Sequence, residues 1–183
     1  MWKIAALPLL VALIAMPAGG ASADDQPDFK LCQSTYALCT TAPCTPVAGT
    51  KDTVSCACKV ETGYSAGLEA CQDPTETSDG KQIHSRYFPV KSYAVCTNDR
   101  PWAWCLDKPC IVDKDDPTKA SCACTSVKDQ GPYVVVTDDY TDKTCSTGII
   151  SSATVTQITQ VTDFLKKSSE LKPFDIKVLN GGK

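Results

Sequence analysis

The sequence predicts a small disulfide-rich, mainly β protein with two tandem six-cysteine repeats carrying β-hairpins, followed by a C-terminal α-helix. Three observations predict this fold class: twelve cysteines in 183 residues, a cysteine spacing that recurs 66 residues later, and helical apolar periodicity after the last cysteine. The cysteines expected in disulfides are Cys32, Cys39, Cys44, Cys56, Cys58, Cys71, Cys96, Cys105, Cys110, Cys122, Cys124 and Cys145.

The first residues have the layout of a cleavable export signal. Lys3 precedes an uncharged apolar stretch, and Ala21-Ser22-Ala23 supplies the small residues of a cleavage site. The apolar run is shorter than the roughly 20 residues that span a membrane. We therefore expect residues 1–23 to be a signal peptide cut after Ala23, and the product to be periplasmic or secreted without a membrane anchor.

The cysteine pattern is duplicated within the chain. Ser55-Cys56-Ala57-Cys58 is identical to Ser121-Cys122-Ala123-Cys124, and Cys39 and Cys44 have counterparts at the same offset of 66 residues. A duplicated unit had to fold alone, so we expect the six cysteines of each repeat to pair among themselves. Six cysteines allow 15 pairings, and the spacing does not choose among them.

Each repeat is expected to contain a β-hairpin. Segments 44–47 and 53–60 flank a glycine-containing turn, and segments 110–113 and 120–127 flank a second turn. Residues two apart on a strand face the same side. Both cysteines of each Cys-Ala-Cys should therefore point into one core and reach two different partner segments.

The remaining segments divide the chain. We expect repeats at 24–71 and 94–145, a polar connector at 72–93 and a helical tail at 146–183. An extra strand is predicted at Tyr133–Thr137. Apolar residues every three or four positions from Val155 predict a helix of about four to five turns that ends at Pro173, and alternation after it predicts a short strand.

The duplicated Cys-Ala-Cys unit resembles small cysteine-rich exported bacterial proteins to which no activity is attached. The resemblance covers the repeats and consists of spacings plus a few residues. It implies no functional residues.

Charge excludes two classes of partner. The chain has 18 basic and 21 acidic residues, a net charge of −3, and no basic run. Nucleic acid and anionic membranes both require clustered Lys and Arg. The expected partner is an unknown protein or small-molecule ligand, and no cofactor is expected.

Enzymatic and metal chemistry lack the usual patterns. His84 is the only histidine and falls in the connector, where we expect an exposed side chain rather than a general base. Zinc knuckles and redox sites favour two or more residues between paired cysteines, whereas this chain has Cys-x-Cys twice. The acids Asp138, Asp139 and Asp142, like Asp113, Asp115 and Asp116, lack the full pattern of a calcium loop.

Trp102 and Trp104 precede Cys105 and match Tyr36 and Leu38 in the first repeat, so core packing beside a disulfide is expected. The sequence thus favours an exported, non-enzymatic binding or cell-envelope interaction protein. One alternative is a double-headed protease inhibitor that presents Lys51 and Lys119 on its hairpin tips. The other is a thiolate metal-binding protein.

Overall fold

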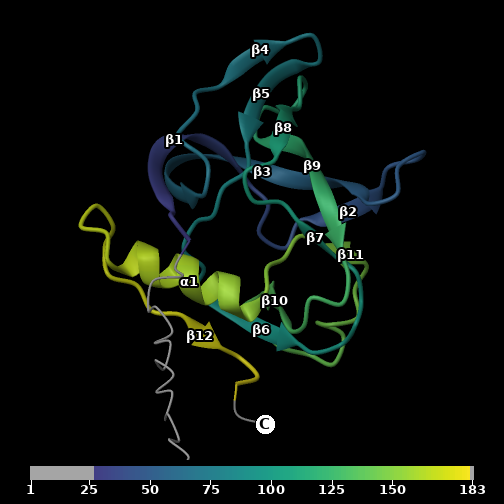
Figure 1. The fold of residues 1–183 in the computed structure, drawn as a ribbon, viewed down its shortest axis with the longest axis vertical. Helices are drawn as coiled ribbons and strands as arrows, with labels where there is room; N and C mark the ends of the chain where they lie inside the picture. The colour runs from purple at the N-terminus through teal and green to yellow at the C-terminus, as the bar shows by residue number, and fades with distance from the viewer. Residues whose placement is uncertain (1–26, 182–183) are drawn as a thin grey trace, which may run out of the picture.

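A computed structural model describes residues 27–181 (Figure 1). The predicted signal peptide lies outside the described residues. The elements are β1 (Lys30–Leu38), β2 (Pro43–Pro46), β3 (Thr53–Gly67), β4 (Thr75–Thr77), β5 (Gly80–His84), β6 (Ser92–Cys96), β7 (Trp102–Trp104), β8 (Pro109–Val112), β9 (Lys119–Val127), β10 (Tyr133–Val136), β11 (Ile149–Ile150), α1 (Val155–Lys166) and β12 (Lys177–Val178). The prediction of a mainly β, disulfide-rich fold with a C-terminal helix is confirmed.

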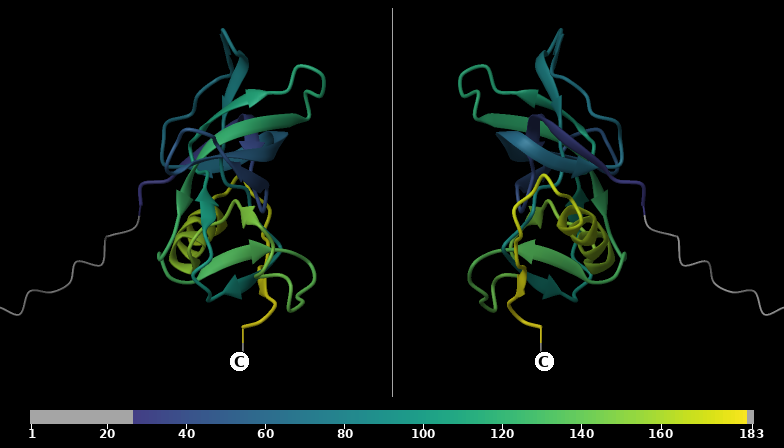
Figure 2. Two further views of the ribbon diagram at one scale, coloured as in Figure 1. Left: turned by 90° about the vertical axis from the view of Figure 1, so that its right-hand side faces the viewer. Right: turned by 90° about the vertical axis from the view of Figure 1, so that its left-hand side faces the viewer.

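The strands form two sheets. The larger has the order β11-β2-β3-β9-β8-β5-β4, with β1 also on β3 and β7 also on β9. The smaller has the order β10-β6-β12. Figure 2 shows the two sheets one above the other, with α1 beside the smaller one.

Two hairpins form where the turn residues predict them. β2 pairs with β3 across residues 47–52, and β8 pairs with β9 across residues 113–118. Both tips contain polar or glycine residues, and Gly49 has the positive φ of 79° that its turn requires. The predicted extra strand is confirmed as β10.

The six disulfides all link cysteines within one half of the chain. They are Cys32–Cys71, Cys39–Cys58, Cys44–Cys56, Cys96–Cys145, Cys105–Cys124 and Cys110–Cys122. As expected from strand alternation, each Cys-Ala-Cys reaches two segments: Cys56 bonds β2 and Cys58 bonds the end of β1. A set of six disulfides points to an oxidising extracellular or periplasmic environment.

Backbone contacts in the first half recur between residues 66 positions later. Ala37 faces Val60 in β1–β3 as Ala103 faces Ser126 in β7–β9. The two central strands, β3 and β9, run antiparallel with Cys56 opposite Cys122. Because these two cysteines occupy matching positions, a local two-fold axis passes between them.

The two halves exchange strands across this axis. β5 follows the first group of cysteines but pairs with β8, placing Ile83 opposite Cys110. β11 follows the second group but pairs with β2, placing Ile149 opposite Cys44. The halves therefore share one sheet and one core instead of folding as separate domains.

Segment 72–93, expected to be a connector, contains β4 and β5 and contributes to the core. Ile83 is 1% exposed and packs among the cysteines. The polar composition of the segment obscured this strand, since its neighbours on β5 are half-buried or exposed.

Helix α1 packs its apolar stripe against the smaller sheet. Ile158, Val161 and Leu165 are buried in a cluster that includes Val134 of β10. Thr154 caps the helix through a reciprocal capping box with Gln157. No helix among the described residues is long and apolar enough to cross a membrane.

The predicted length of the helix is wrong. The helix has 12 residues, a little over three turns, and ends well before Pro173. The hydroxyls of Ser168 and Ser169 both hydrogen-bond the Glu170 carboxylate, at 2.6 and 3.1 Å. Such local side-chain bonds compete with helix continuation.

Candidate functional site

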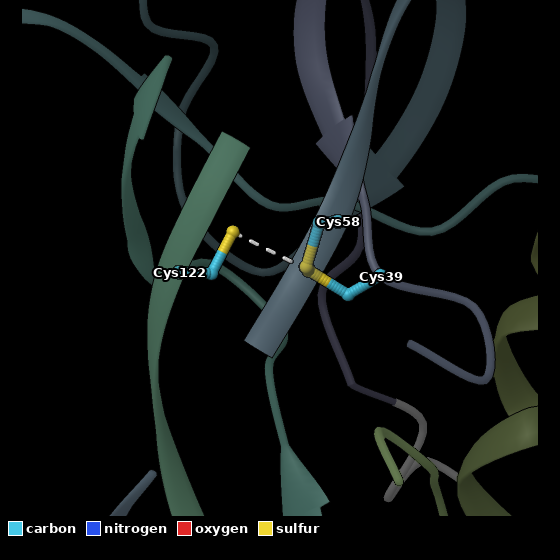
Figure 3. Close-up of side chains that lie close together, drawn as sticks. All are labelled: Cys39, Cys58 and Cys122. Carbon is cyan, nitrogen blue, oxygen red and sulfur yellow. Dashed lines mark hydrogen bonds between the residues drawn. A yellow bond between two sulfur atoms is a disulfide. The ribbon is translucent and has the colours of Figure 1, made fainter. Parts of the chain in front are cut away.

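The central core consists largely of disulfides. Of its 15 buried residues, eight are cysteines, from the two Cys-Ala-Cys strands and the segments that they bond. Figure 3 shows Cys39 and Cys58 in one disulfide with Cys122 beside them. The Sγ atoms of Cys39 and Cys122 lie 3.4 Å apart, and because neither carries a proton this is a packing contact between two disulfides.

Two groups of sulfur atoms in this core have the spacing of a metal site. Cys39, Cys58 and Cys122 form one group and Cys39, Cys105 and Cys124 the other, each with its sulfurs within 4.8 Å. A thiolate is the metal-binding form of cysteine. All of these sulfurs are in disulfides, so the oxidised protein offers no thiolate here.

His84 lies in β5, half-buried, opposite Pro109 of β8. It is therefore a strand residue rather than the exposed linker side chain expected. Among the described residues, no side chain hydrogen-bonds the imidazole, so no nucleophile and base are brought together around it.

The acidic turns are built from their own hydrogen bonds. The Asp113 carboxylate accepts from the amides of Asp115 and Asp116, at 2.8 and 3.1 Å. The hydrogen bonds from Lys119 and Thr118 lower the pKa of Asp116 to about 2. In the other turn, Asp138 accepts from the Ser92 hydroxyl at 3.0 Å.

The tryptophans contribute to packing. Trp102 is 3% exposed and stacks on Tyr133, with ring centroids 6.3 Å apart. Trp104 is half-buried and meets Trp102 edge-on. This position beside the Cys105–Cys124 disulfide agrees with the core role expected from the sequence.

The two lysines proposed for the hairpin tips are not equivalent. Lys51 is exposed in the turn between β2 and β3. Lys119 is instead the first residue of β9, opposite Lys59, and its ammonium lies 2.7 Å from the Asp116 carboxylate. The placement of Lys119 at a tip was therefore wrong.

A buried ion pair joins the halves. The Nη1 atom of Arg86 lies 3.1 Å from the Asp107 carboxylate, with the two side chains 4% and 9% exposed. Nη2 of Arg86 donates to the Lys30 carbonyl at 2.9 Å and contacts Cys32 Sγ at 3.0 Å. Desolvation lowers the pKa of Arg86, and Asp107 and Glu69 oppose that change.

Sequence reasoning missed this pair, since Arg86 and Asp107 show no spacing that links them. The corresponding positions of the other half hold Ser152 and Thr41, whose hydroxyls reach the carbonyls of Val134 and Val136 at 2.5 and 3.1 Å. One charged contact in the first half thus has a neutral counterpart in the second.

A groove lies on the outward face of the central strands. Its floor includes Ser55 and Ala57 of β3 and Ser121 of β9, and the two serine Oγ atoms are 2.7 Å apart. The turns that hold Asp79 and Lys114 contribute to its sides, and its volume is about 620 Å³. The alternation that sends the cysteines inward sends these small side chains outward, and that was the signal available in the sequence.

No family model, curated protein or solved structure matches the chain.

Proposed function

We propose that this chain is an exported, non-enzymatic binding protein whose groove over β3 and β9 holds a segment of a partner polypeptide in the cell envelope or outside the cell. The groove on the outward face of the disulfide core is the observation that carries the proposal. Its size is that of sites that enclose a small ligand or a short peptide segment, about 300–1,000 Å³.

The chemistry of the groove suits a polypeptide. Ser55 and Ser121 offer hydroxyls on an otherwise apolar floor of small residues, and small side chains allow a second backbone to approach closely. The sides carry charges of both signs, at Lys114 and Asp79, which can orient a polar chain without selecting a strongly charged one.

The scaffold makes the groove rigid. Directly behind the floor, Cys44–Cys56 anchors β3 to β2 and Cys110–Cys122 anchors β9 to β8. A site held in its bound geometry loses little conformational entropy when it binds. The disulfides thus serve binding by preorganisation as well as stability.

We further propose that the chain is a tandem duplication of one six-cysteine unit. The recurrence of registers 66 positions apart and the reciprocal exchange of β5 and β11 support this history. The duplication places matching residues on the two sides of the groove floor, as with Ser55 and Ser121.

Site-specific photo-crosslinking tests the groove. A benzoylphenylalanine at position 57, on the groove floor, is irradiated in the exporting host, and the purified protein is weighed intact. The matched control is position 123, which is exposed on the same sheet face and does not line the groove. We expect an adduct of defined mass from position 57 alone.

Two results would contradict the proposal: no adduct at position 57, or equal adducts at positions 57 and 123. A binding constant that is unchanged in Ala57→Trp, measured with the crosslinked partner once identified, would do the same.

The protease-inhibitor alternative now concerns the β2–β3 tip, because Lys51 is exposed there and Lys119 is not at a tip. Inhibition of a trypsin-like protease that is lost in Lys51→Ala would favour it. The thiolate metal-binding alternative would require reduction of the core, and zinc that copurifies with the untreated protein would favour it.

A further inference from the structure

We propose that Cys32–Cys71 is a redox-active disulfide, at which an external dithiol exchanges with the protein while the other five disulfides stay intact. The site consists of an exposed sulfur to attack and a buried sulfur held beside a cation. This inference is independent of the proposed binding function.

The two cysteines differ in exposure in the way that directional attack needs. Cys71 is exposed in the segment between β3 and β4, whereas Cys32 in β1 is 2% exposed. An incoming thiolate can therefore reach Cys71 and not Cys32. Attack at Cys71 makes Cys32 the leaving group.

Arg86 is placed to stabilise that leaving group. Its Nη2 atom is 3.0 Å from Cys32 Sγ, and it is the only cationic side chain that hydrogen-bonds a sulfur among the described residues. A neighbouring guanidinium favours the thiolate form of a cysteine. A thiol with a lower pKa also leaves faster in thiol–disulfide exchange.

The guanidinium is fixed in this position. Nη1 pairs with Asp107 and donates to the Glu69 carbonyl, and Nη2 also donates to the Lys30 carbonyl. Asp107 offsets part of the positive charge. The position is nevertheless buried, so water weakens the remaining attraction between Arg86 and a Cys32 thiolate much less than it would at the surface.

The chain contains its own control. Cys96–Cys145 occupies the corresponding place in the second half, with Cys96 fully buried and Cys145 half-buried. The residue that corresponds to Arg86 is Ser152, whose hydroxyl donates to Val134 O instead. The four remaining disulfides lie in the buried core.

The reaction balances with a dithiol as reductant. Its thiolate attacks Cys71 Sγ, a new S–S bond forms, the Cys32–Cys71 bond breaks, and the electron pair goes to Cys32 as a thiolate beside Arg86. The second thiol of the reductant then attacks its own sulfur in the mixed disulfide. Cys71 leaves as a thiolate that takes up a proton, and the reductant departs oxidised.

Graded reduction of the native full-length protein tests the assignment. The protein is treated with dithiothreitol near pH 7 without denaturant, quenched with an alkylating reagent, and mapped by mass spectrometry. Cys32 and Cys71 should be labelled at least about tenfold faster than Cys96 and Cys145, since an arginine neighbour shifts a pKa by about one unit or more. Equal or slower labelling would overturn the proposal.

A variant separates the effect of Arg86 from the exposure of Cys71. Arg86→Ser combined with Asp107→Thr installs the residues of the second half and removes both charges together. We expect the rate at Cys32–Cys71 to fall about tenfold while the rate at Cys96–Cys145 is unchanged. An unchanged rate at Cys32–Cys71 would show that exposure alone accounts for the reactivity, and would refute the role of Arg86.

A measurement on single thiols does not depend on that variant folding. Cys71→Ser leaves only Cys32 free, and Cys145→Ser leaves only Cys96 free. Thiolate absorbance near 240 nm should give Cys32 a pKa below the ordinary value of about 8.5, and Cys96 a pKa above it. A Cys32 pKa at or above the ordinary value would contradict the proposal.

Discussion

Removing the charge of Asp107 should expose the energetic weight of the contact between the halves. Asp107→Asn keeps the residue's shape and its oxygen acceptor but leaves the Arg86 guanidinium, 4% exposed, without a counter-charge. The Asn oxygen can still accept from the Leu68 amide, now at 2.7 Å from the carboxylate. The loss of one partner of a buried pair costs about 3–5 kcal/mol, and the retained hydrogen bond favours the lower end.

Urea unfolding followed by tryptophan fluorescence measures this loss. The matched control is Asp129→Asn, because Asp107 and Asp129 both have a φ of 56° but Asp129 is exposed. We expect a loss of about 3 kcal/mol in the free energy of unfolding for Asp107→Asn and less than about 0.5 kcal/mol for the control. A loss below about 1 kcal/mol for Asp107→Asn would refute the reasoning.

Three further predictions concern other contacts. Gly67→Ala should destabilise the fold by about 1–3 kcal/mol in the same unfolding assay, because a Cβ there would lie 2.2 Å from a carboxylate oxygen of the ion pair; Gly148→Ala, with nothing within 4 Å, should be neutral. The Asp116 carboxyl, followed by NMR, should titrate near pH 2 and shift upward in Lys119→Gln; since its pKa is depressed, its contribution to stability is present above pH 3.8 and is lost as the pH falls through about 2. Thr154→Ala should cost about 1 kcal/mol by removing the cap of α1, seen as a lower midpoint in urea.

Local structure could be predicted from the sequence where turns and alternation specify it. The two hairpins follow from polar turns between β-prone runs, and the inward direction of both cysteines in each Cys-Ala-Cys follows from the period of a strand. The choice among 15 pairings could not be predicted, because it depends on which segments β2 and the end of β1 bring alongside β3.

The exchange of strands between halves was missed, although a signal existed. Ile83 and Ser85 have counterparts at Ile149 and Ser151, at the same offset of 66 residues as the cysteines. The polar residues around Ile83 hid the strand, and only the pairing of β5 with β8 reveals why an isoleucine is buried there.

The candidate site was even less accessible from the sequence. The groove is formed by residues from β3, β8, β9 and the turn before β5, so no local pattern marks it. The contact of Arg86 with Cys32 also joins residues 54 positions apart, and a single arginine in a polar stretch gives no sign of burial.

Disulfide mapping of the native protein tests the central claim most directly. The exported protein is purified without reductant, its free thiols are counted, and its unreduced peptides are identified by mass spectrometry. The account predicts no free thiol and six bonds, each within one half of the chain, including Cys39–Cys58 and Cys110–Cys122. A bond between the halves, such as one from Cys39 to Cys122 across their 3.4 Å contact, or a set of free core thiols, would contradict it.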